Sequence, residues 1–173
     1  NRSALEAMIE TLHNEGAKII EVKLPAPVDD YRHTGSVINW TESLSIHEKD
    51  FVESNELMGQ ALREKMMSGF MTRAVDYVAA QRRRRELTAS LDALVRSVDA
   101  LVLPGAFHVA PPFEDPDRLK AFTTDTAMTP FNLSGHPGMS VCTGFDDQDL
   151  PTNAQIVGRW FDESTVLNVA RAY

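Results

Sequence analysis

Serine, cysteine and histidine are the side chains of this sequence that could act as a nucleophile or a base. Ser140 lies in Gly138-Met-Ser-Val-Cys142, which comes close to the Gly-x-Ser-x-Gly pattern of a nucleophile elbow. Cys142 replaces the second glycine, which the strained turn of an elbow requires, and no helical pattern follows directly. The sequence therefore does not favour a serine triad built on Ser140.

Cys142 is the single cysteine of the chain. One cysteine cannot form an intramolecular disulfide, which fits a reducing compartment and predicts a cytoplasmic location. The segment around it is apolar, so Cys142 is expected to be a small buried hydrophobic residue. A nucleophilic cysteine would need an electropositive and partly exposed setting.

The histidines are scattered, and no pair of them has a convincing metal-ligand spacing. The five are His13, His33, His47, His108 and His136. A metal site would have to join His33 to His47, and surface or packing roles are favoured for all five. No glycine loop that could cradle a phosphate occurs either. We therefore expect no metal site and no cofactor.

The charge of the chain also excludes some classes of partner. The formal net charge is −8 and the calculated isoelectric point is about 5.1, which argues against nucleic acid as the main partner. The run Arg82 to Arg85 would sweep around a helix and is interpreted as a solvated surface. No apolar run reaches the length of a membrane span, so no membrane partner is expected.

The first third of the chain predicts a helix, a strand and a further helical stretch. Ser3 and Glu6 have capping-box spacing, an apolar helical face follows, and Gly16 is a natural stop. Residues 17–24 alternate apolar and polar side chains and predict a strand. Residues 31–70 are helical but interrupted, with weak points at Gly35, Asn55 and Gly59 and a break at Ser68-Gly69.

The remainder alternates between helix and strand. Residues 72–98 predict a helix, and the unbroken apolar segment 99–104 is typical of a strand in a parallel sheet. Residues 104–137 predict a long irregular loop, which is the kind of segment that often carries function. Further expected elements are strands at 139–142 and 154–160, an acidic turn at 144–151, and a last helix capped by Asp162 or Ser164. The fold class is α/β.

The segment Thr129-Pro-Phe-Asn-Leu-Ser-Gly-His-Pro-Gly-Met-Ser-Val141 closely resembles the C-terminal block of the amidase-signature family. Leu150-Pro151 and Gln155-Ile-Val-Gly158 follow in the order that this family shows. The resemblance extends from the opening helix to the last one, so that it spans essentially the whole chain. It implies that residues 1–173 are a single C-terminal fragment of an α/β/α domain, with helices layered on a large mixed sheet.

The resemblance also implies an activity. Family members hydrolyse carboxylic amides to an acid and ammonia or an amine, without a cofactor. They use two serines and a lysine that lie in a serine-rich N-terminal region. No such region occurs here, and the lysines have no serine-rich partner (Lys18, Lys23, Lys49, Lys65 and Lys120). We therefore assign no catalytic residue and expect the chain alone to be inactive.

The resemblance also implies that this chain forms one side of a pocket for a small amide substrate. The residues expected there are Pro104, Gly105, Asn132 and Gly135, which we call the predicted pocket wall. Each could instead serve only the backbone or the loop. The sequence departs from the family at Cys142, at Asp149, at Thr152-Asn153 and at Gly105, which stands in place of a common threonine. Because of these departures, the resemblance does not identify the class of substrate.

The partners follow from the same reasoning. We expect the missing N-terminal part of the amidase as a partner, and self-association through surfaces that the fragment leaves exposed. Two alternatives remain open. One is a non-catalytic accessory or binding module of amidase fold, and the other is part of a subunit resembling a glutamyl-tRNA amidotransferase.

Overall fold

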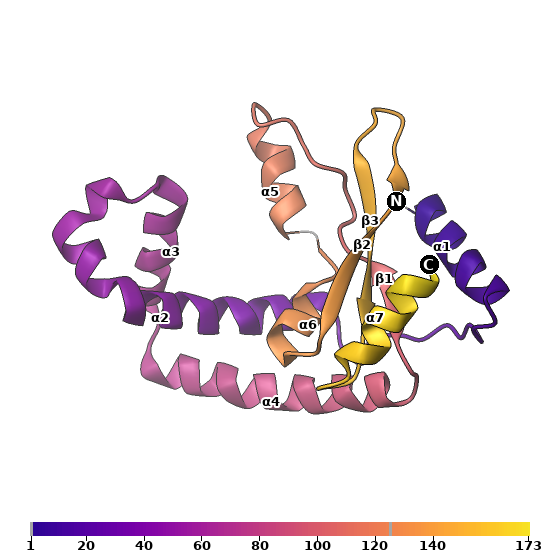
Figure 1. Cartoon of the computed structure of the whole chain (residues 1–173). Coiled ribbons are helices and arrows are strands. Elements are labelled where there is room, and N and C mark those ends of the chain that lie inside the picture. The colour runs from indigo at the N-terminus through magenta and orange to yellow at the C-terminus, as the bar shows by residue number, and fades with distance from the viewer. Residues whose placement is uncertain (1, 125) are drawn as a thin grey trace. The chain divides into compact units, whose positions relative to one another are not determined.

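In the computed structural model, residues 2–124 and 126–173 are described, and the chain divides into two compact units. Unit 1 comprises Asn1–Pro25 and Ser90–Tyr173, and unit 2 comprises Ala26–Ala89. Helix α4 (Ala74–Arg96) therefore begins in unit 2 and ends in unit 1 (Figure 1).

A three-stranded sheet forms the centre of unit 1. It consists of β1 (Leu101–Pro104), β2 (Gly138–Phe145) and β3 (Pro151–Val157) in the order β1-β3-β2. Both pairings are antiparallel, so the parallel arrangement expected for residues 99–104 is wrong within this chain. An apolar run shows only that both faces of a strand are covered, and it does not fix strand direction. The expected mixture of helices and sheet is confirmed.

Helices α1 (Arg2–Asn14) and α7 (Glu163–Ala172) cover one face of this sheet (Figure 1). The buried cluster between helices and sheet is Met8, Leu12, Ala154, Ile156 and Val166. Alternation along the strands places the two β3 members of this cluster on the same face, two residues apart. We call this face of the sheet the core face.

The ends of these two helices are partly as expected. Asp162 caps α7, because its Oδ1 accepts a hydrogen bond from the backbone N–H of Thr165 at 3.3 Å. The bonds from Thr165 and Ser164 hold the pKa of Asp162 below its ordinary value. The capping box at Ser3 is wrong, since α1 already includes Arg2 and Glu6 pairs with that residue instead. Gly16 stops α1 with a φ of 97°.

Residues 17–24, expected to be a strand, pair with no other strand of the described chain. The side chains of Ile19, Ile20 and Val22 are 45%, 51% and 37% exposed. The alternating pattern is present, but a strand also needs a partner for its backbone groups. Within the described residues the expected strand is therefore wrong.

The expected irregular stretch 104–137 contains two short helices, α5 (Pro116–Thr124) and α6 (Thr129–Ser134). Pro116 and Pro130 stand in the first turns of these helices, where a missing N–H does no harm. The prolines that suggested a loop thus mark helix starts. Gly135, with φ 76°, ends α6 in the left-handed conformation.

Unit 2 is a helical hairpin followed by the first part of α4. Its elements are α2 (Val28–Ser54), the short 3-10 helix η1 (Asn55–Leu57) and α3 (Gln60–Met71). The chain breaks at residues 55–59, as Asn55 and Gly59 indicated. It does not break at Gly69, which lies inside α3.

The reason for Gly69 is a close approach of α3 to α2. A Cβ added at this position would lie 2.6 Å from the carbonyl oxygen of Trp40 and 2.9 Å from the Cβ of Leu44. Glycine is therefore needed here for helix packing, and the sequence alone could not distinguish this need from a helix break.

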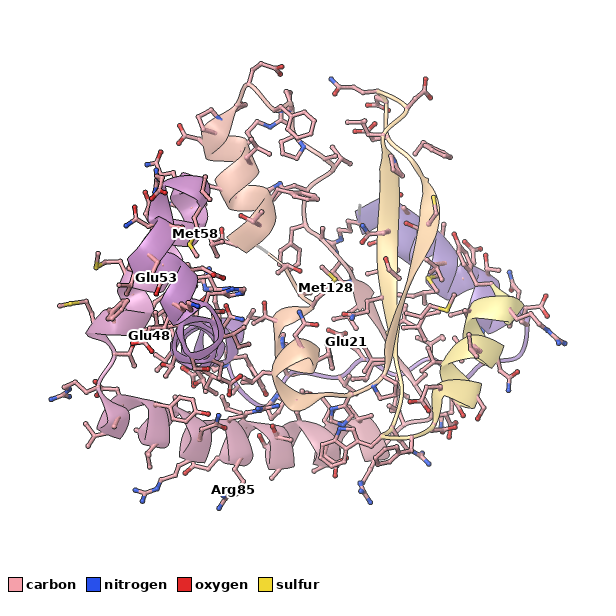
Figure 2. The ribbon with its side chains drawn as sticks, turned by 60° about the vertical axis from the view of Figure 1, so that its left-hand side comes forward. Glu21, Glu48, Glu53, Met58, Arg85 and Met128 are labelled. Atoms are coloured by element: carbon pink, nitrogen blue, oxygen red, sulfur yellow. The ribbon has the colours of Figure 1, made fainter. Side chains whose placement is uncertain are left out.

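Helix α4 is confirmed over most of its expected length. Leu87, Leu91 and Val95 are at most 2% exposed and form its buried side, whereas Val75 and Val78 are exposed. The arginine run is solvated: Arg85 is exposed, and Arg83 pairs with Glu86 and Asp30 at 2.9 Å each (Figure 2). None of the described helices combines the length and apolarity that crossing a membrane requires.

The variant Gly69→Ala should lower the free energy of unfolding by about 1–3 kcal/mol, because the added methyl group meets Trp40 backbone atoms. Urea unfolding followed by circular dichroism measures the change. Gly59→Ala is the matched control, since nothing lies within 4 Å of the Cβ it would add. Equal unfolding midpoints for the two variants would contradict the packing role of Gly69.

Candidate functional site

The two loops that carry the predicted pocket wall are joined by hydrogen bonds. The carbonyl oxygen of Gly105 accepts a bond from Thr126 Oγ1 at 3.0 Å. The same hydroxyl oxygen accepts from the backbone N–H of Met128 at 3.2 Å. Met128 precedes α6, and its carbonyl oxygen accepts from the N–H of Asn132 at 3.1 Å. Thr126 therefore links the end of β1 to the helix that carries Asn132.

The side chain of Asn153 on β3 also packs against Gly105. Asn153 Oδ1 accepts a hydrogen bond from the N–H of Ala106 at 3.1 Å and lies where a Cβ of residue 105 would be. A side chain at position 105 would displace this amide. The two departures from the family noted at Gly105 and Asn153 are thus physically coupled: the small residue makes room for the larger one.

The four residues of the predicted pocket wall have different settings. Gly105 is buried and Pro104 is half-buried at the end of β1, opposite Ala154. Asn132 and Gly135 are exposed on α6 and at its end. The structure connects Gly105 to Asn132 through Thr126. Sequence reasoning did not find Thr126, and its only signal was a polar residue before α6.

A row of three residues, two of them polar, crosses the sheet on the face opposite the core face. Antiparallel register places Gln155 of β3 between Leu103 of β1 and Ser140 of β2. Gln155 is 7% exposed, and its Oε1 has no hydrogen-bond partner among the described residues. Buried amide oxygens are normally satisfied. The Oε1 of Gln155 is therefore a buried acceptor that the described residues leave without a partner.

Cys142 and Ser140 lie on the same face of β2, and both are exposed. The expectation that Cys142 is buried is wrong. β2 is an edge strand whose alternate residues, Met139 and Val141, pack against the core cluster. The apolar neighbours in sequence therefore point to the opposite side of the sheet from Cys142.

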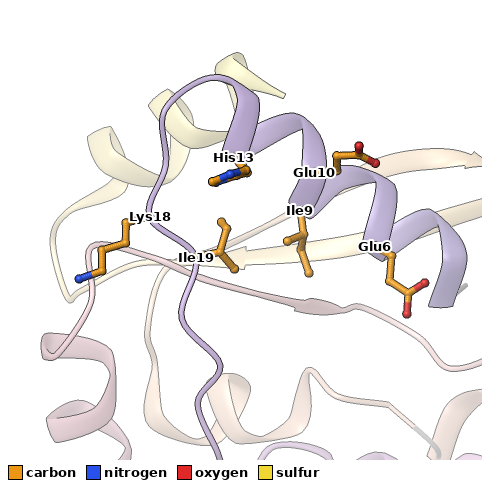
Figure 3. Close-up of a pocket in the computed structure, with 6 residues that line it drawn as sticks. All are labelled: Glu6, Ile9, Glu10, His13, Lys18 and Ile19. Atoms are coloured by element: carbon orange, nitrogen blue, oxygen red, sulfur yellow. The ribbon is translucent and has the colours of Figure 1, made fainter.

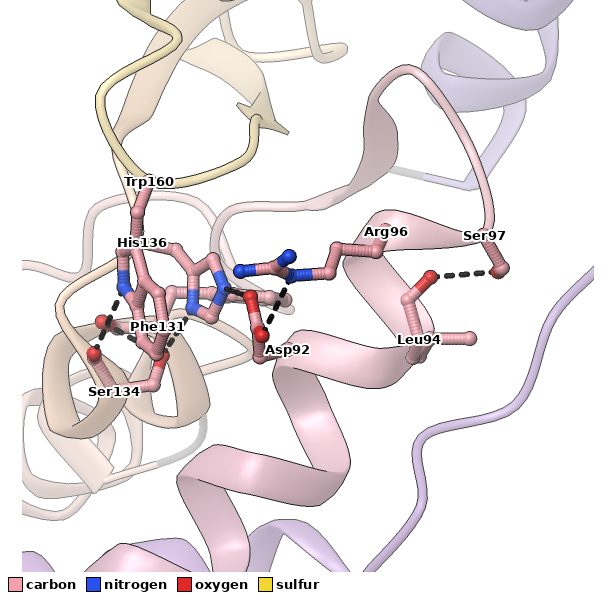
Figure 4. A network of polar contacts seen from close by, with 8 residues as sticks. All are labelled: Asp92, Leu94, Arg96, Ser97, Phe131, Ser134, His136 and Trp160. Atoms are coloured by element: carbon pink, nitrogen blue, oxygen red, sulfur yellow. Dashed lines mark hydrogen bonds and ion pairs between the residues drawn. The ribbon is translucent and has the colours of Figure 1, made fainter.

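A buried polar network joins α4 to the connection between α6 and β2 (Figure 4). His136 Nδ1 lies 2.8 Å from Ser134 Oγ, and its Nε2 lies 3.4 Å from Asp92 Oδ1. Arg96 pairs with the other oxygen of Asp92 at 2.8 Å. The imidazole stacks on Trp160 with ring centres 4.7 Å apart.

This network contains the serine, histidine and aspartate of a catalytic triad, but these side chains are not accessible to a substrate. Asp92 can only accept, so Nε2 of His136 carries the proton and Nδ1 accepts from Ser134. The His136 side chain is fully buried and Ser134 is 7% exposed, so neither faces a space where a substrate could react. The network is structural, as expected for a packing histidine. Sequence reasoning missed Asp92, which is 44 residues away.

The network also fixes the turn between α6 and β2. Trp160 Nε1 donates to the carbonyl oxygen of Ser134 at 3.3 Å, and Gly158 N–H donates to that of Pro137 at 3.0 Å. Residues 134–137 are thus tied to α4 and to the segment after β3. Because Gly135 lies in this turn, the network sets the position of one end of the predicted pocket wall.

An open groove of roughly 490 Å³ lies elsewhere in unit 1, between α1 and the segment that follows it (Figure 3). Ile9 and Ile19 give it an apolar lining, and charged or titratable side chains surround them. The six lining residues are Glu6, Ile9, Glu10, His13, Lys18 and Ile19. None belongs to the predicted pocket wall. Across residues 2–124 and 126–173, no three His, Cys, Asp or Glu side chains gather as metal ligands would.

Comparison with known proteins agrees with the fold. The sequence profile of the amidase family matches residues 1–167. A glutamyl-tRNA(Gln) amidotransferase subunit of Chloroflexus aggregans is 30% identical over 99% of this chain and 40% of its own length. Fatty acid amide hydrolase of Medicago truncatula is 32% identical over 91% of this chain and 27% of its own length.

Solved structures show the same arrangement. A crystal structure of an amidase superposes with a TM-score of 0.84 at 27% identity, over 99% of this chain and 40% of that one. Allophanate hydrolase of Kluyveromyces lactis gives 0.85 at 19% identity and covers 28% of that chain, which supports the fold alone. Fold and sequence define an α/β chain that resembles the corresponding part of these amidases. The chain belongs to the amidase family, and it spans two fifths or less of these relatives.

The coupling of Gly105 to Asn153 can be measured with a double-mutant cycle. Gly105→Ala should destabilise the chain by about 1–3 kcal/mol, because its Cβ collides with the Asn153 amide. In the background Asn153→Ala the same change should cost at least about 1 kcal/mol less. Urea unfolding measures all four free energies. Additive effects would show that the two positions are independent.

The burial of His136 has a consequence for pH. Desolvation lowers the pKa of His136 below its ordinary value of about 6.5, although Asp92 opposes this shift. Between the folded and the unfolded pKa, only the unfolded chain binds the proton. The stability from His136 is therefore complete above about pH 6.5 and is lost as the pH falls below that value.

Urea midpoints measured between pH 7.5 and 5 should fall more steeply for the unchanged chain than for His136→Gln. His47→Gln is the control, since the His47 side chain is 45% exposed, and it should keep the original slope. A titration of His136 by NMR gives the folded pKa directly. A value above 6.5 would contradict the dominance of desolvation.

Proposed function

We propose that residues 1–173 are the C-terminal portion of an amidase that hydrolyses carboxylic amides to an acid and ammonia or an amine. The chain contributes sheet, helices and one wall of the substrate pocket, and it is inactive by itself. The observation that carries this proposal is the family match over residues 1–167 together with the share of 40% or less that the chain covers in its relatives.

The face of the sheet opposite α1 and α7 supports this assignment. It carries Gln155 and the exposed Ser140, and the remainder of the parent amidase would lie toward this face. Pro104, Gly105, Asn132 and Gly135 then form a wall toward the amide substrate, and Thr126 holds the two loops of that wall together.

The catalytic nucleophile belongs to the remainder of the parent protein. The serines that could be suspected here are Ser140 on an edge strand and Ser134 in a buried network. Neither has a base that is both adjacent and accessible, which nucleophilic catalysis requires. We place the reaction in the cytoplasm and assign it no cofactor.

A second function is favoured by one observation. The Chloroflexus relative, which is named for a glutamyl-tRNA(Gln) amidotransferase, matches 99% of this chain at 30% identity. The chain would then be part of an amidotransferase subunit, and the same amide chemistry would release ammonia for transfer. The net charge of −8 does not exclude this role, because partner subunits could hold the RNA.

The purified chain should show no turnover of aliphatic or aromatic amides above the buffer rate, because the nucleophile is absent. Ammonia release measured by a coupled assay tests this. Supplying the upstream part of the parent protein, in one chain or by co-expression, should restore hydrolysis. Activity of the chain alone that Ser140→Ala or Ser134→Ala abolishes would overturn the assignment. Tight binding without turnover in the reconstituted protein would favour an accessory module.

A further inference from the structure

The backbone pairing between β1 and β3 ends where the turn after β1 begins. The last regular pair of this ladder is Pro104 with Ala154. The next bond, from the N–H of Gly105 to the carbonyl oxygen of Asn153, is 3.5 Å long, which is longer than an ordinary hydrogen bond. The ladder therefore weakens at Gly105, which belongs to the predicted pocket wall.

The pairing between β3 and β2 becomes irregular at the same level. Cys142 of β2 pairs with Asn153, and the register then shifts between Cys142 and Gly144. A bulge of this kind leaves one residue unpaired and bends its strand. Backbone pairing is therefore irregular on both sides of Asn153, so that side-chain bonds are needed to fix the turn beyond it.

The side chain of Asn153 continues the β1–β3 ladder by one residue. Its Oδ1 accepts a hydrogen bond from the N–H of Ala106 at 3.1 Å. Because a backbone N–H can only donate, the side-chain atom that faces it is the amide oxygen. Ala106 is 5% exposed, and a buried N–H that loses an acceptor is costly. The bond therefore fixes the peptide group between Gly105 and Ala106.

This peptide group transmits the position of Asn153 to the second loop of the wall. The carbonyl oxygen of Gly105 belongs to it and accepts from Thr126 Oγ1 at 3.0 Å. Ala106 also forms an isolated antiparallel bridge with Thr126. Thr126 in turn accepts from the N–H of Met128 in front of α6. Asn153 is thus the point at which both loops are anchored on the sheet.

We propose that Asn153 is a positioning residue for amide hydrolysis, which fixes both loops of the predicted pocket wall by accepting the hydrogen bond of Ala106. It acts through Gly105 and Thr126, and it touches neither the substrate nor the nucleophile. The inference rests on the proposed function and adds the residue that positions the substrate-facing loops. Because the nucleophile lies elsewhere, loss of the bond should raise KM much more than it lowers kcat.

Steady-state kinetics of the reconstituted parent protein test the role, with benzamide or hexanamide as the substrate, whichever the unchanged protein hydrolyses faster. Asn153→Ala should raise KM about tenfold and change kcat less than about threefold, because the wall is displaced. Asn153→Asp keeps an oxygen acceptor and should stay within about threefold of the original KM. The control Asn168→Ala removes an exposed amide on α7 and should change neither constant.

A second variant tests the path from Asn153 to α6. Thr126→Val removes the hydroxyl that bonds to both Gly105 and Met128. It should raise KM as well. Combined with Asn153→Ala, it should raise KM by less than the product of the two single effects, since both changes break the same path. Single effects that multiply would overturn this path.

Amide hydrogen exchange in the chain itself tests the hydrogen bond without activity. In Asn153→Ala the N–H of Ala106 should exchange at least about tenfold faster, and in Asn153→Asp it should keep its protection. The N–H of Gly158, which donates to Pro137 at 3.0 Å, is the internal control. Equal acceleration at both amides would show that Asn153 acts on stability as a whole, which would overturn a positioning role.

The kinetic outcomes separate this proposal from the proposed function. An unchanged KM in Asn153→Ala would overturn the positioning role alone. So would a KM of Asn153→Asp as high as that of Asn153→Ala, since the amide NH₂ rather than the oxygen would then matter. A reconstituted protein that hydrolyses no amide would overturn the proposed function, and the positioning role with it, even where exchange at Ala106 shows the hydrogen bond.

Discussion

The central strand β3 has to form hydrogen bonds along both edges and bury side chains on both faces, and the arrangement of unit 1 depends on this constraint. Its edges are occupied by β1 and β2. On the core face, Ala154 and Ile156 are fully buried beneath α1 and α7. The opposite face carries Gln155 and Asn153, so β3 contributes apolar packing on one side and polar positioning on the other. A single strand thereby joins the core to the candidate site.

Polar side chains, rather than regular structure, hold the loops around that sheet. Asn153 supports the turn after β1, Thr126 connects this turn to α6, and His136 anchors the far end of α6 to α4. Each of these contacts is buried or half-buried, where a hydrogen bond left unmade is costly. The loops are therefore held in defined positions although they contain little secondary structure. The backbone fold is shared with an amidase at a TM-score of 0.84 and with an allophanate hydrolase at 0.85.

Two surfaces of unit 1 carry unsatisfied groups of different kinds. The polar face leaves Gln155 Oε1 without a partner among the described residues, whereas residues 18–24 leave backbone and apolar side chains exposed. The first is a single enclosed oxygen, whereas the second is a row of alternating backbone groups with no hydrogen bond to another described residue.

The sequence by itself determined the α/β class, the helices at both ends, the strands near 139–142 and 154–160 and the family, because periodicity and a specific motif are local in the chain. It placed Asn132 in an irregular stretch, whereas Asn132 lies on α6, and it did not predict Thr126 as the link to Gly105. Tertiary structure alone decided the antiparallel pairing of β1, the packing role of Gly69, the exposure of Cys142 and the burial of His136 against Asp92. Each of these depends on a neighbour far away in the chain, and local patterns carry no information about such neighbours.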